Sequence, residues 1–432
     1  MRILHLVPGS GGTFYCQNCV RDRALVRALR RAGHDVIMVP LYLPMFGEEG
    51  SVGAKAPIFF GGVNMYLREK VPFLRNMPKW MDRLLDSPWV LRQAAAREKS
   101  TNAADLGPMT LSMLRGRRGN QQKEFDRFLA WLTEQDKPYI IHVSNALLLG
   151  FAPAIKNVID VPIVCSLQDE EPWVDAMHPP YDQRVWEAIA ENAKCVSRFI
   201  STSAWYAERM INRMGLARDR VSVVFPGVET DDLPAAELSF DPPVIGFLER
   251  LSRGQGLGLL IDAFTALKRM PQFKNLRLRA TGGSTPADAQ FHEDLHAKLH
   301  REGMDDAVEF LHEFRLAQRG EFLRSLSVLS VPVPGGEAFG LQLLEAMAHG
   351  VPVVQPAAGA YPEIVNATGG GVLYDPDDPN GLTEALQSLL EIPDEARRLG
   401  RQGREVILAQ FNMDRVVREM IAVYAAALDE KT

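Results

Sequence analysis

Short apolar runs recur along the chain, separated by stretches in which apolar residues follow helical spacing. The runs are a few residues long and are bounded by Gly, Pro or polar residues, which is typical of buried strands. One series lies at residues 3–7, 35–40, 140–143, 163–166 and 199–202. A second series lies at residues 244–248, 276–280, 308–311, 327–331 and 351–355. Strands that alternate with helices predict an α/β protein with parallel, doubly wound sheets.

Two such series predict two domains. A chain of 432 residues is too long for one ordinary core. We therefore expect two doubly wound, Rossmann-like domains that face a central cleft, at residues 1–228 and 229–412. Ligands bind such sheets beyond the carboxyl ends of their strands.

Composition narrows the class of protein. Hydrophobic residues make up 46% of the chain and charged residues 24%, which is typical of a globular protein. The net charge of −6 argues against general nucleic-acid binding, and four cysteines do not form a disulfide scaffold, which favours a reducing compartment. The first strand starts without a signal peptide, and no apolar run is long enough to span a bilayer. We expect a cytoplasmic protein.

The segment at residues 336–353 carries the most chemical information. Residues 341–349 are rich in helix formers, and Gly350 suits a left-handed helix C-cap. Gly340 lets the backbone approach a ligand closely, and the free N–H groups of the first helical turn favour a phosphate. The segment predicts a helix start that binds an anion.

Two acids flank this helix start. Glu337 precedes the helix and is free to reach the group beyond the phosphates. Glu345 lies one turn below Leu341 on the same face, where its carboxylate can accept two hydrogen bonds from a ribose diol. The alternative is that both are ordinary acids, one in a surface loop and one half-buried. The Gly-rich surroundings and the strand that follows favour the ligand-binding interpretation.

The spacing of Glu337 and Glu345 around Phe339, Gly340 and Leu341 resembles the signature of the family 4 glycosyltransferases. These are retaining enzymes of the GT-B fold. Similar elements of that family occur at residues 221–233, 246–264, 357–365 and 371–376. The match covers almost all of the C-terminal half and patches of the N-terminal half.

The resemblance implies a hexosyltransferase that moves a sugar from a nucleotide-sugar, with a UDP- or GDP-sugar expected, to a glycan, lipid-linked or small-molecule acceptor. Glu337 would hold the sugar, Glu345 the ribose, and residues 339–341 would line the donor site. It also implies that the C-terminal helix, about residues 413–432, joins the first domain. No cofactor and no metal are expected, because an arginine and backbone dipoles can carry the phosphate charge.

Further donor contacts are implied in the second domain. Arg250 falls where the family places an arginine on the diphosphate, and a guanidinium suits bidentate phosphate binding. Gln255 stands where the family usually has a lysine, so one positive charge is missing unless Arg253 replaces it. Gly282 resembles the glycine turn that faces the nucleotide, and Glu313 follows the strand whose neighbourhood recognises the base.

The first domain departs from the family where catalysis is expected. Gln168 occupies the position of a histidine near the transferred sugar, and an amide can bond a hydroxyl but cannot titrate. Asp169 is then the nearest candidate for activating the acceptor, although this acidic run could equally be a solvated loop. Gly12 belongs to a Gly-rich loop that either contacts the sugar-phosphate or forms a tight turn. The Cys16 and Cys19 pair after it favours packing over redox or zinc chemistry.

An insertion at about residues 45–120 somewhat resembles the acceptor-side insertion of starch and glycogen synthases. Its aromatic and basic residues, at about 64–100, suggest either a lid or peripheral contact with the inner face of a membrane. The alternative is a helical subdomain that buries its aromatic residues. Two other functions stay open: a weak or inactive nucleotide-sugar-binding protein, which Gln168 and Gln255 would permit, and a GT-B nucleotide-sugar epimerase.

Overall fold

The computed structural model describes residues 1–9, 15–42, 103–231, 233–311 and 316–430. The chain divides into two compact units. The first comprises Met1–Gly12, Asp22–Val224 and Val417–Thr432, and the second comprises Thr13–Arg21 and Phe225–Val416. Residues 13–21 thus group with the second unit, although the sequence predicted that they belong to the first domain.

The first unit is built on a six-stranded parallel sheet with the order β2-β1-β3-β4-β5-β6. The strands are β1 (Arg2–Val7), β2 (Asp35–Pro40), β3 (Ile140–Val143), β4 (Ile163–Leu167), β5 (Arg198–Ser201) and β6 (Val221–Val223). Every residue of β3 and β4 is buried, as expected for strands that helices cover on both faces.

The helices of the first unit are α1 (Gln17–Arg31), α5 (Gly107–Leu114), α6 (Gln122–Glu134), α7 (Phe151–Lys156), α8 (Glu171–Val174), α9 (Tyr181–Asn192), α10 (Ala204–Met214) and α18 (Met413–Asp429). The first five residues of α1 and the first four residues of α18 belong to the second unit. Helix α18 packs on the first sheet, because the Tyr424 hydroxyl lies 2.9 Å from Nδ1 of His142 in β3. Helix α5 falls within the predicted insertion, whose residues 43–102 lie outside the described part of the chain.

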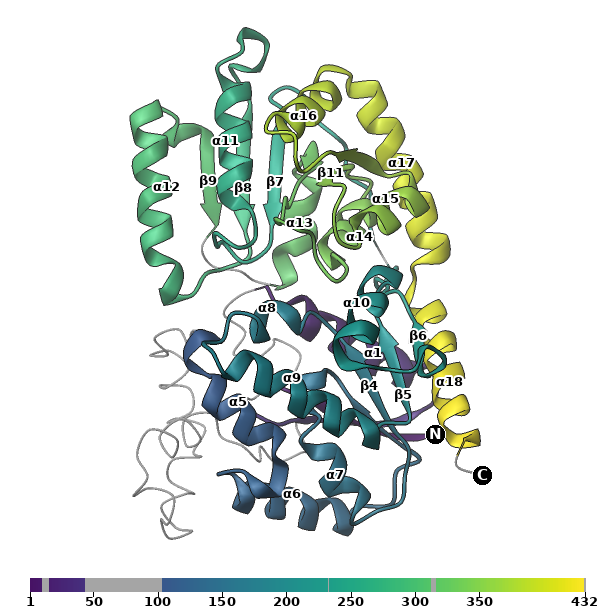
Figure 1. Cartoon of the computed structure of the whole chain (residues 1–432). Coiled ribbons are helices and arrows are strands. Elements are labelled where there is room, and N and C mark those ends of the chain that lie inside the picture. The colour runs from purple at the N-terminus through teal and green to yellow at the C-terminus, as the bar shows by residue number, and fades with distance from the viewer. Residues whose placement is uncertain (10–14, 43–102, 232, 312–315, 431–432) are drawn as a thin grey trace. The chain divides into compact units, whose positions relative to one another are not determined.

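The second unit repeats this architecture with the strand order β12-β11-β10-β7-β8-β9. Its strands are β7 (Val244–Leu248), β8 (Arg277–Thr281), β9 (Val308–Leu311), β10 (Val328–Leu329), β11 (Val353–Pro356) and β12 (Gly371–Tyr374). Its helices are α11 (Leu257–Lys268), α12 (Ala289–Glu302), α13 (Arg319–Arg324), α14 (Leu341–Ala348), α15 (Tyr361–Thr368), α16 (Gly381–Glu391) and α17 (Pro393–Gln410). Figure 1 shows these helices around the sheet.

The strand order reverses between β7 and β10, which lie side by side. Chain connections leave a crevice beyond the carboxyl ends of the strands at such a point. The loops after β7 and β10 carry Arg250 and the start of α14, so both meet at this edge of the sheet. The topology thereby gathers the predicted donor residues of the second unit.

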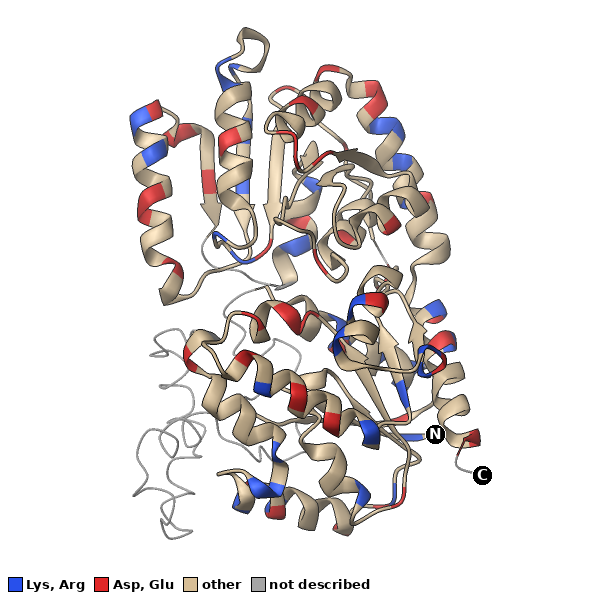
Figure 2. Ribbon diagram, viewed as in Figure 1, with Lys and Arg blue, Asp and Glu red and all other residues tan. Residues whose placement is uncertain are grey.

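The predicted α/β class with two doubly wound domains is confirmed, and the element limits differ by a few residues. Strand β10 covers Val328–Leu329 rather than residues 327–331, and β11 begins at Val353 rather than residue 351. Helix α1 begins at Gln17 and ends at Arg31. Helix α14 ends before Gly350, which adopts the expected left-handed conformation with φ of 79°. Lys, Arg, Asp and Glu are found mainly in helices and loops and are sparse in the strands of both sheets (Figure 2).

Candidate functional site

The loop between β10 and α14 depends on glycines for its shape. Gly340 precedes α14 with φ of 115°, and a Cβ there would lie 2.9 Å from Leu343 and 3.0 Å from the ring of Tyr361. Gly336 has φ of 79°, and its Cβ would lie 2.4 Å from the backbone nitrogen of Gly359. Neither Gly336 nor Gly340 leaves room for a side chain, so the backbone of the loop that carries Glu337 depends on glycine at both positions.

Glu337 is buried at the mouth of α14, with 7% of its surface exposed. Its carboxylate accepts hydrogen bonds from Gln342 Nε2 at 2.9 Å, the Tyr361 hydroxyl at 2.9 Å and Gln17 Nε2 at 3.1 Å. Burial raises the pKa of Glu337, and these three donors act in the opposite direction. A carboxylate held by three donors is fixed in orientation for a ligand.

Glu345 lies inside α14 and is equally buried. Its two oxygens accept from the Tyr15 hydroxyl at 2.9 Å and pair with the Arg319 guanidinium at 3.1 Å. Burial raises the pKa of Glu345, whereas the charge of Arg319 and the hydrogen bond from Tyr15 lower it. Burial and the neighbouring carboxylate in turn raise the pKa of Tyr15, so this phenol stays protonated and donates.

Gln17 connects Glu249 and Glu337 to the backbone of α14. Its amide nitrogen donates to Glu249 at 2.8 Å and to Glu337 at 3.1 Å, and its amide oxygen accepts the Leu341 N–H at 2.8 Å. The first N–H of α14 is thus engaged by a side chain more than 300 residues away in sequence. Phe339 and the side chain of Leu341 are buried beneath the loop.

Arg250 follows β7 and is held in place by Asp288. Its guanidinium donates to both carboxylate oxygens of Asp288 at 2.9–3.0 Å and to the Thr285 hydroxyl at 3.0 Å. This bidentate pairing fixes the plane of the guanidinium beside the glycine turn at Gly282. Gly282 has φ of 139°, and a Cβ there would lie 2.1 Å from the Glu249 carbonyl oxygen.

Arg253 is the residue that could supply the positive charge of the family's lysine. Arg253 is largely exposed and lies 3.8 Å from Asp294, with its guanidinium 5.3 Å from the centre of the Phe291 ring. Gln255 is half-buried in the turn before α11. Two other predicted residues, Gly12 and Glu313, lie outside the described residues.

Gln168, Asp169 and Glu170 follow β4 in the first unit. Gln168 is buried, and its amide nitrogen donates to the carbonyl oxygen of Ser144. Asp169 is exposed and has φ of 60°, the one non-glycine residue with positive φ in the described part of the chain. Because this conformation is rarely adopted by residues other than glycine, asparagine and aspartate, its surroundings must maintain it.

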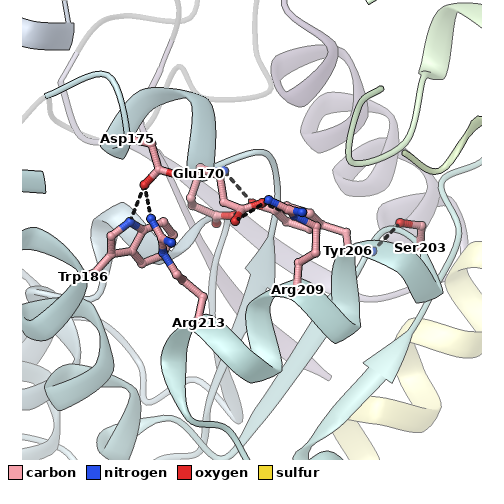
Figure 3. A network of polar contacts seen from close by, with 8 residues as sticks. Glu170, Asp175, Trp186, Ser203, Tyr206, Arg209 and Arg213 are labelled. Atoms are coloured by element: carbon pink, nitrogen blue, oxygen red, sulfur yellow. Dashed lines mark hydrogen bonds and ion pairs between the residues drawn. The ribbon is translucent and has the colours of Figure 1, made fainter. Parts of the chain in front are cut away.

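Glu170 anchors this turn (Figure 3). Its carboxylate accepts hydrogen bonds from the backbone N–H groups of Ala146 and Gln168, each at 2.8 Å. It also accepts a hydrogen bond from the Tyr206 hydroxyl at 2.7 Å. Burial raises the pKa of Glu170, and these hydrogen bonds lower it. Tyr206 is in turn placed by Ser203, whose hydroxyl accepts the Tyr206 N–H and caps α10.

Two ion pairs beside Glu170 tie α10 to the elements that follow β4 (Figure 3). Arg209 makes a bidentate pair with Glu171 of α8 at 2.6 and 3.1 Å. Arg213 pairs with Asp175, which also accepts from the Trp186 indole at 2.8 Å. The network holds the residues after β4 in one arrangement.

Some functional candidates carry no sequence pattern of their own. Tyr15, Gln17, Arg319 and Tyr361 contact the two glutamates but lie in three different segments. The proximity of residue 17 to the glycine-rich loop was the one available hint. Among the described residues, no group of three or more His, Cys, Asp or Glu side chains could hold a metal ion. No helix within the same ranges is long and apolar enough to cross a membrane.

Family comparisons fit this geometry. The model of the glycosyl transferases group 1 matches residues 229–406, and the model named Glycosyltransferase Family 4 matches residues 95–232. Together the two models cover residues 95–406, most of the chain. The chain belongs to the family 4 glycosyltransferases. The two matches meet within a few residues of the division between the units.

Curated members of the family are similar over part of their length. A D-inositol 3-phosphate glycosyltransferase of Gordonia bronchialis is 28% identical over 54% of this chain and 52% of its own. Its counterpart in Xylanimonas cellulosilytica is 30% identical over 51% and 55%. An MMP alpha-(1->4)-mannosyltransferase of Mycolicibacterium hassiacum is 29% identical over 57% and 59%. The chain spans about half the length of the curated relatives it matches.

Solved structures share the GT-B fold over the whole chain. Sucrose-phosphate synthase of Thermosynechococcus elongatus superposes with a TM-score of 0.70 and 18% identity and covers 100% of both chains. HepE of Anabaena in complex with UDP and glucose has a TM-score of 0.68 and 16% identity over 99% of this chain and 100% of its own. The catalytic domain of starch synthase IV of Arabidopsis thaliana, bound to ADP and acarbose, has a TM-score of 0.67 and 12% identity over 99% of each chain. The predicted GT-B family 4 membership is confirmed.

Proposed function

We propose that this protein is a retaining glycosyltransferase that takes a sugar from a nucleoside-diphosphate sugar. The observation that carries the proposal is the pair of buried carboxylates on either side of the α14 start, Glu337 and Glu345, both 7% exposed. Buried carboxylates are costly unless they bind partners. Two of them around a glycine-rich helix start suit the two polyols that flank a diphosphate.

Each group has a distinct role in this proposal. The Glu345 carboxylate accepts from the ribose hydroxyls, and the Leu341 N–H at the start of α14 faces the diphosphate. Arg250, held by Asp288, supplies a fixed positive charge to the leaving diphosphate as the glycosidic bond breaks. Glu337 binds the sugar hydroxyls and orients the anomeric carbon.

The first unit is proposed to contribute the acceptor side. Asp169 is exposed at the carboxyl end of β4, where acceptors approach a sheet of this topology. Its carboxylate would take up the proton of the acceptor hydroxyl. The relatives named above suggest including D-inositol 3-phosphate in an acceptor screen, beside glycan and lipid-linked acceptors.

A binding protein with little turnover is the second candidate. One observation favours it: the residue at the family's histidine position, Gln168, cannot titrate and has its amide nitrogen on the Ser144 carbonyl. Donor binding without hydrolysis or transfer to any acceptor would identify this function.

The decisive experiment compares two variants against a panel of UDP-, GDP- and ADP-sugars and the corresponding free nucleoside diphosphates. Glu345→Ala should lower the affinity for both the sugar nucleotide and the free nucleoside diphosphate by about 10- to 100-fold, because charge-assisted hydrogen bonds are lost. Glu337→Ala should weaken the binding of the sugar nucleotide and should not weaken that of the free diphosphate, because in this proposal its carboxylate contacts the sugar and not the diphosphate.

Calorimetry measures affinity, and mass spectrometry measures hydrolysis and transfer. Glu363→Ala, a half-buried acid in the first turn of α15, is the matched control for loss of a carboxylate near this loop. Unchanged nucleotide affinity in Glu345→Ala, with the fold retained, would refute the proposed donor site.

A further inference from the structure

Residues 15–17 pack on the donor-side groups of the second unit, although they come from the opposite end of the chain. Tyr15 is 1% exposed and belongs to the hydrophobic core of that unit. Its backbone N–H donates to the Gly282 carbonyl oxygen at 2.7 Å. The segment is therefore seated on this unit by backbone and side-chain contacts together.

The contacts of this segment coincide with those assigned to the donor. The Tyr15 hydroxyl lies 2.9 Å from Glu345, where a ribose hydroxyl is proposed to bind. The amide nitrogen of Gln17 lies 3.1 Å from Glu337, the proposed sugar-binding carboxylate. Its amide oxygen lies 2.8 Å from the Leu341 N–H, which is proposed to face the diphosphate.

The chemistry of these two side chains matches that of the ligand. A phenol presents one hydroxyl donor to a carboxylate, as a ribose does. A carboxamide presents N–H donors to one acid and a carbonyl oxygen to a helix N–H, as a sugar hydroxyl and a phosphate oxygen do. One short segment thus supplies a hydrogen bond to each of the two buried carboxylates and to the first N–H of α14.

We propose that residues 15–17 act as an internal surrogate for the donor, which binds only when Tyr15 and Gln17 leave Glu345, Glu337 and the Leu341 N–H. This inference rests on the proposed function, because the displaced groups are those of the nucleotide-sugar site. The apparent dissociation constant of the donor is then the intrinsic constant divided by the fraction of molecules in which the segment has moved away.

The alternative is that Tyr15 and Gln17 stay in place and contact the bound donor themselves. The two arrangements predict opposite signs. Removal of a competitor tightens nucleotide binding, whereas removal of a ligand contact weakens it. The sign of the change in affinity therefore decides between them.

Calorimetric titration with UDP, GDP and ADP tests this in the full chain. Gln17→Ala removes the amide, and Gln17→Met removes its hydrogen bonds while keeping its length. We expect each variant to lower the dissociation constant of the nucleotide that binds by about tenfold. Tyr15→Phe keeps the buried ring and should act in the same direction.

Matched controls remove the same groups elsewhere. Gln290→Ala deletes an exposed amide that bonds Asp294, and Tyr139→Phe deletes the hydroxyl of a tyrosine that is 59% exposed. Both should bind nucleotide as the parent does. Unchanged or weaker binding by Gln17→Ala and Gln17→Met would overturn the surrogate. Failure of the parent and of every variant to bind any of the three nucleotides would instead overturn the proposed function.

The thiol of Cys16, between the two surrogate side chains, gives a second measurement that does not depend on activity. Cys16, Cys19 and Cys195 are partly exposed, Cys165 is buried, and none of the four forms a disulfide. In a Cys19→Ala/Cys195→Ala background, nucleotide should increase the rate at which maleimide labels Cys16, because the segment moves away. Slower or unchanged labelling at saturating nucleotide would show that the segment stays in place.

Discussion

Glu170→Gln is the substitution that best tests how the turn after β4 is held. Glu170 accepts three hydrogen bonds through two oxygens, from the Ala146 N–H, the Gln168 N–H and the Tyr206 hydroxyl. Glutamine has the same shape, but one of its two terminal atoms is an amide nitrogen, which donates.

The cost follows from these contacts. Whichever way the amide is turned, its nitrogen faces one of the two buried backbone N–H groups, which then has no acceptor. A buried donor without a partner costs about 1–3 kcal/mol. The Tyr206 hydroxyl can rotate to accept instead, and the neutral amide avoids burying a charge, which offsets part of the loss. We expect the free energy of unfolding of the first unit to fall by about 1–2 kcal/mol at pH 7.

The difference should depend on pH. Burial raises the pKa of Glu170 above its ordinary value of 4.5, so the folded state binds a proton more readily than the unfolded state. The contribution of Glu170 to stability is fully present below pH 4.5 and declines as the pH rises through the folded pKa. Glutamine does not titrate, so the stability gap between parent and variant should narrow as pH rises from about 4.5 and then stay constant.

Urea unfolding followed by tryptophan fluorescence measures this gap. All six tryptophans precede residue 206, within the sequence of the first unit, so their emission reports that unit alone. With a slope of about 2 kcal/mol/M, the urea midpoint should fall by roughly 0.5–1 M. Glu187→Gln, at an exposed acid of α9, should change little. A gap below about 0.5 kcal/mol, or one that widens with pH, would refute the reasoning.

Three further predictions concern the two units. Asp169→Gly removes the backbone strain at φ of 60°, so the first unit should be as stable as in the parent or more stable by up to about 1 kcal/mol. The rate of sugar transfer should fall about 100-fold. A variant that transfers sugar as fast as the parent would exclude Asp169 as the base. Gly282→Ala should destabilise the second unit by about 2 kcal/mol or more, because the new Cβ would meet the Glu249 carbonyl oxygen. Gly303→Ala, at φ of 65°, places its Cβ in open space and should cost only about 1 kcal/mol. Scanning calorimetry measures both losses. Arg319→Met removes the positive charge that lowers the pKa of Glu345, so Glu345 becomes protonated at higher pH than in the parent. Nucleotide affinity should therefore begin to fall at a higher pH as the solution is acidified. The same dependence of affinity on pH in variant and parent would contradict this pairing.

The sequence pattern predicted strand limits well wherever turn residues bound an apolar run on both sides. The strand limits at residues 35–40, 140–143, 244–248 and 308–311 agree with the structure, because apolar runs there are bounded by turn residues. Strand β10 was predicted too long, since a continuous apolar run does not show where ladder pairing ends.

The sequence by itself determined the two-unit α/β class, the helix start at Gly340 and the two glutamates around it. These follow from short-range rules of periodicity, capping and spacing, to which distant residues contribute little. The tertiary structure alone decided what surrounds those glutamates. It brings Tyr15 and Gln17 onto α14, pairs Glu345 with Arg319 and turns the Gln168 amide toward the Ser144 carbonyl. Such contacts join residues up to 330 positions apart, and only the closure of the fold brings those residues within hydrogen-bonding distance.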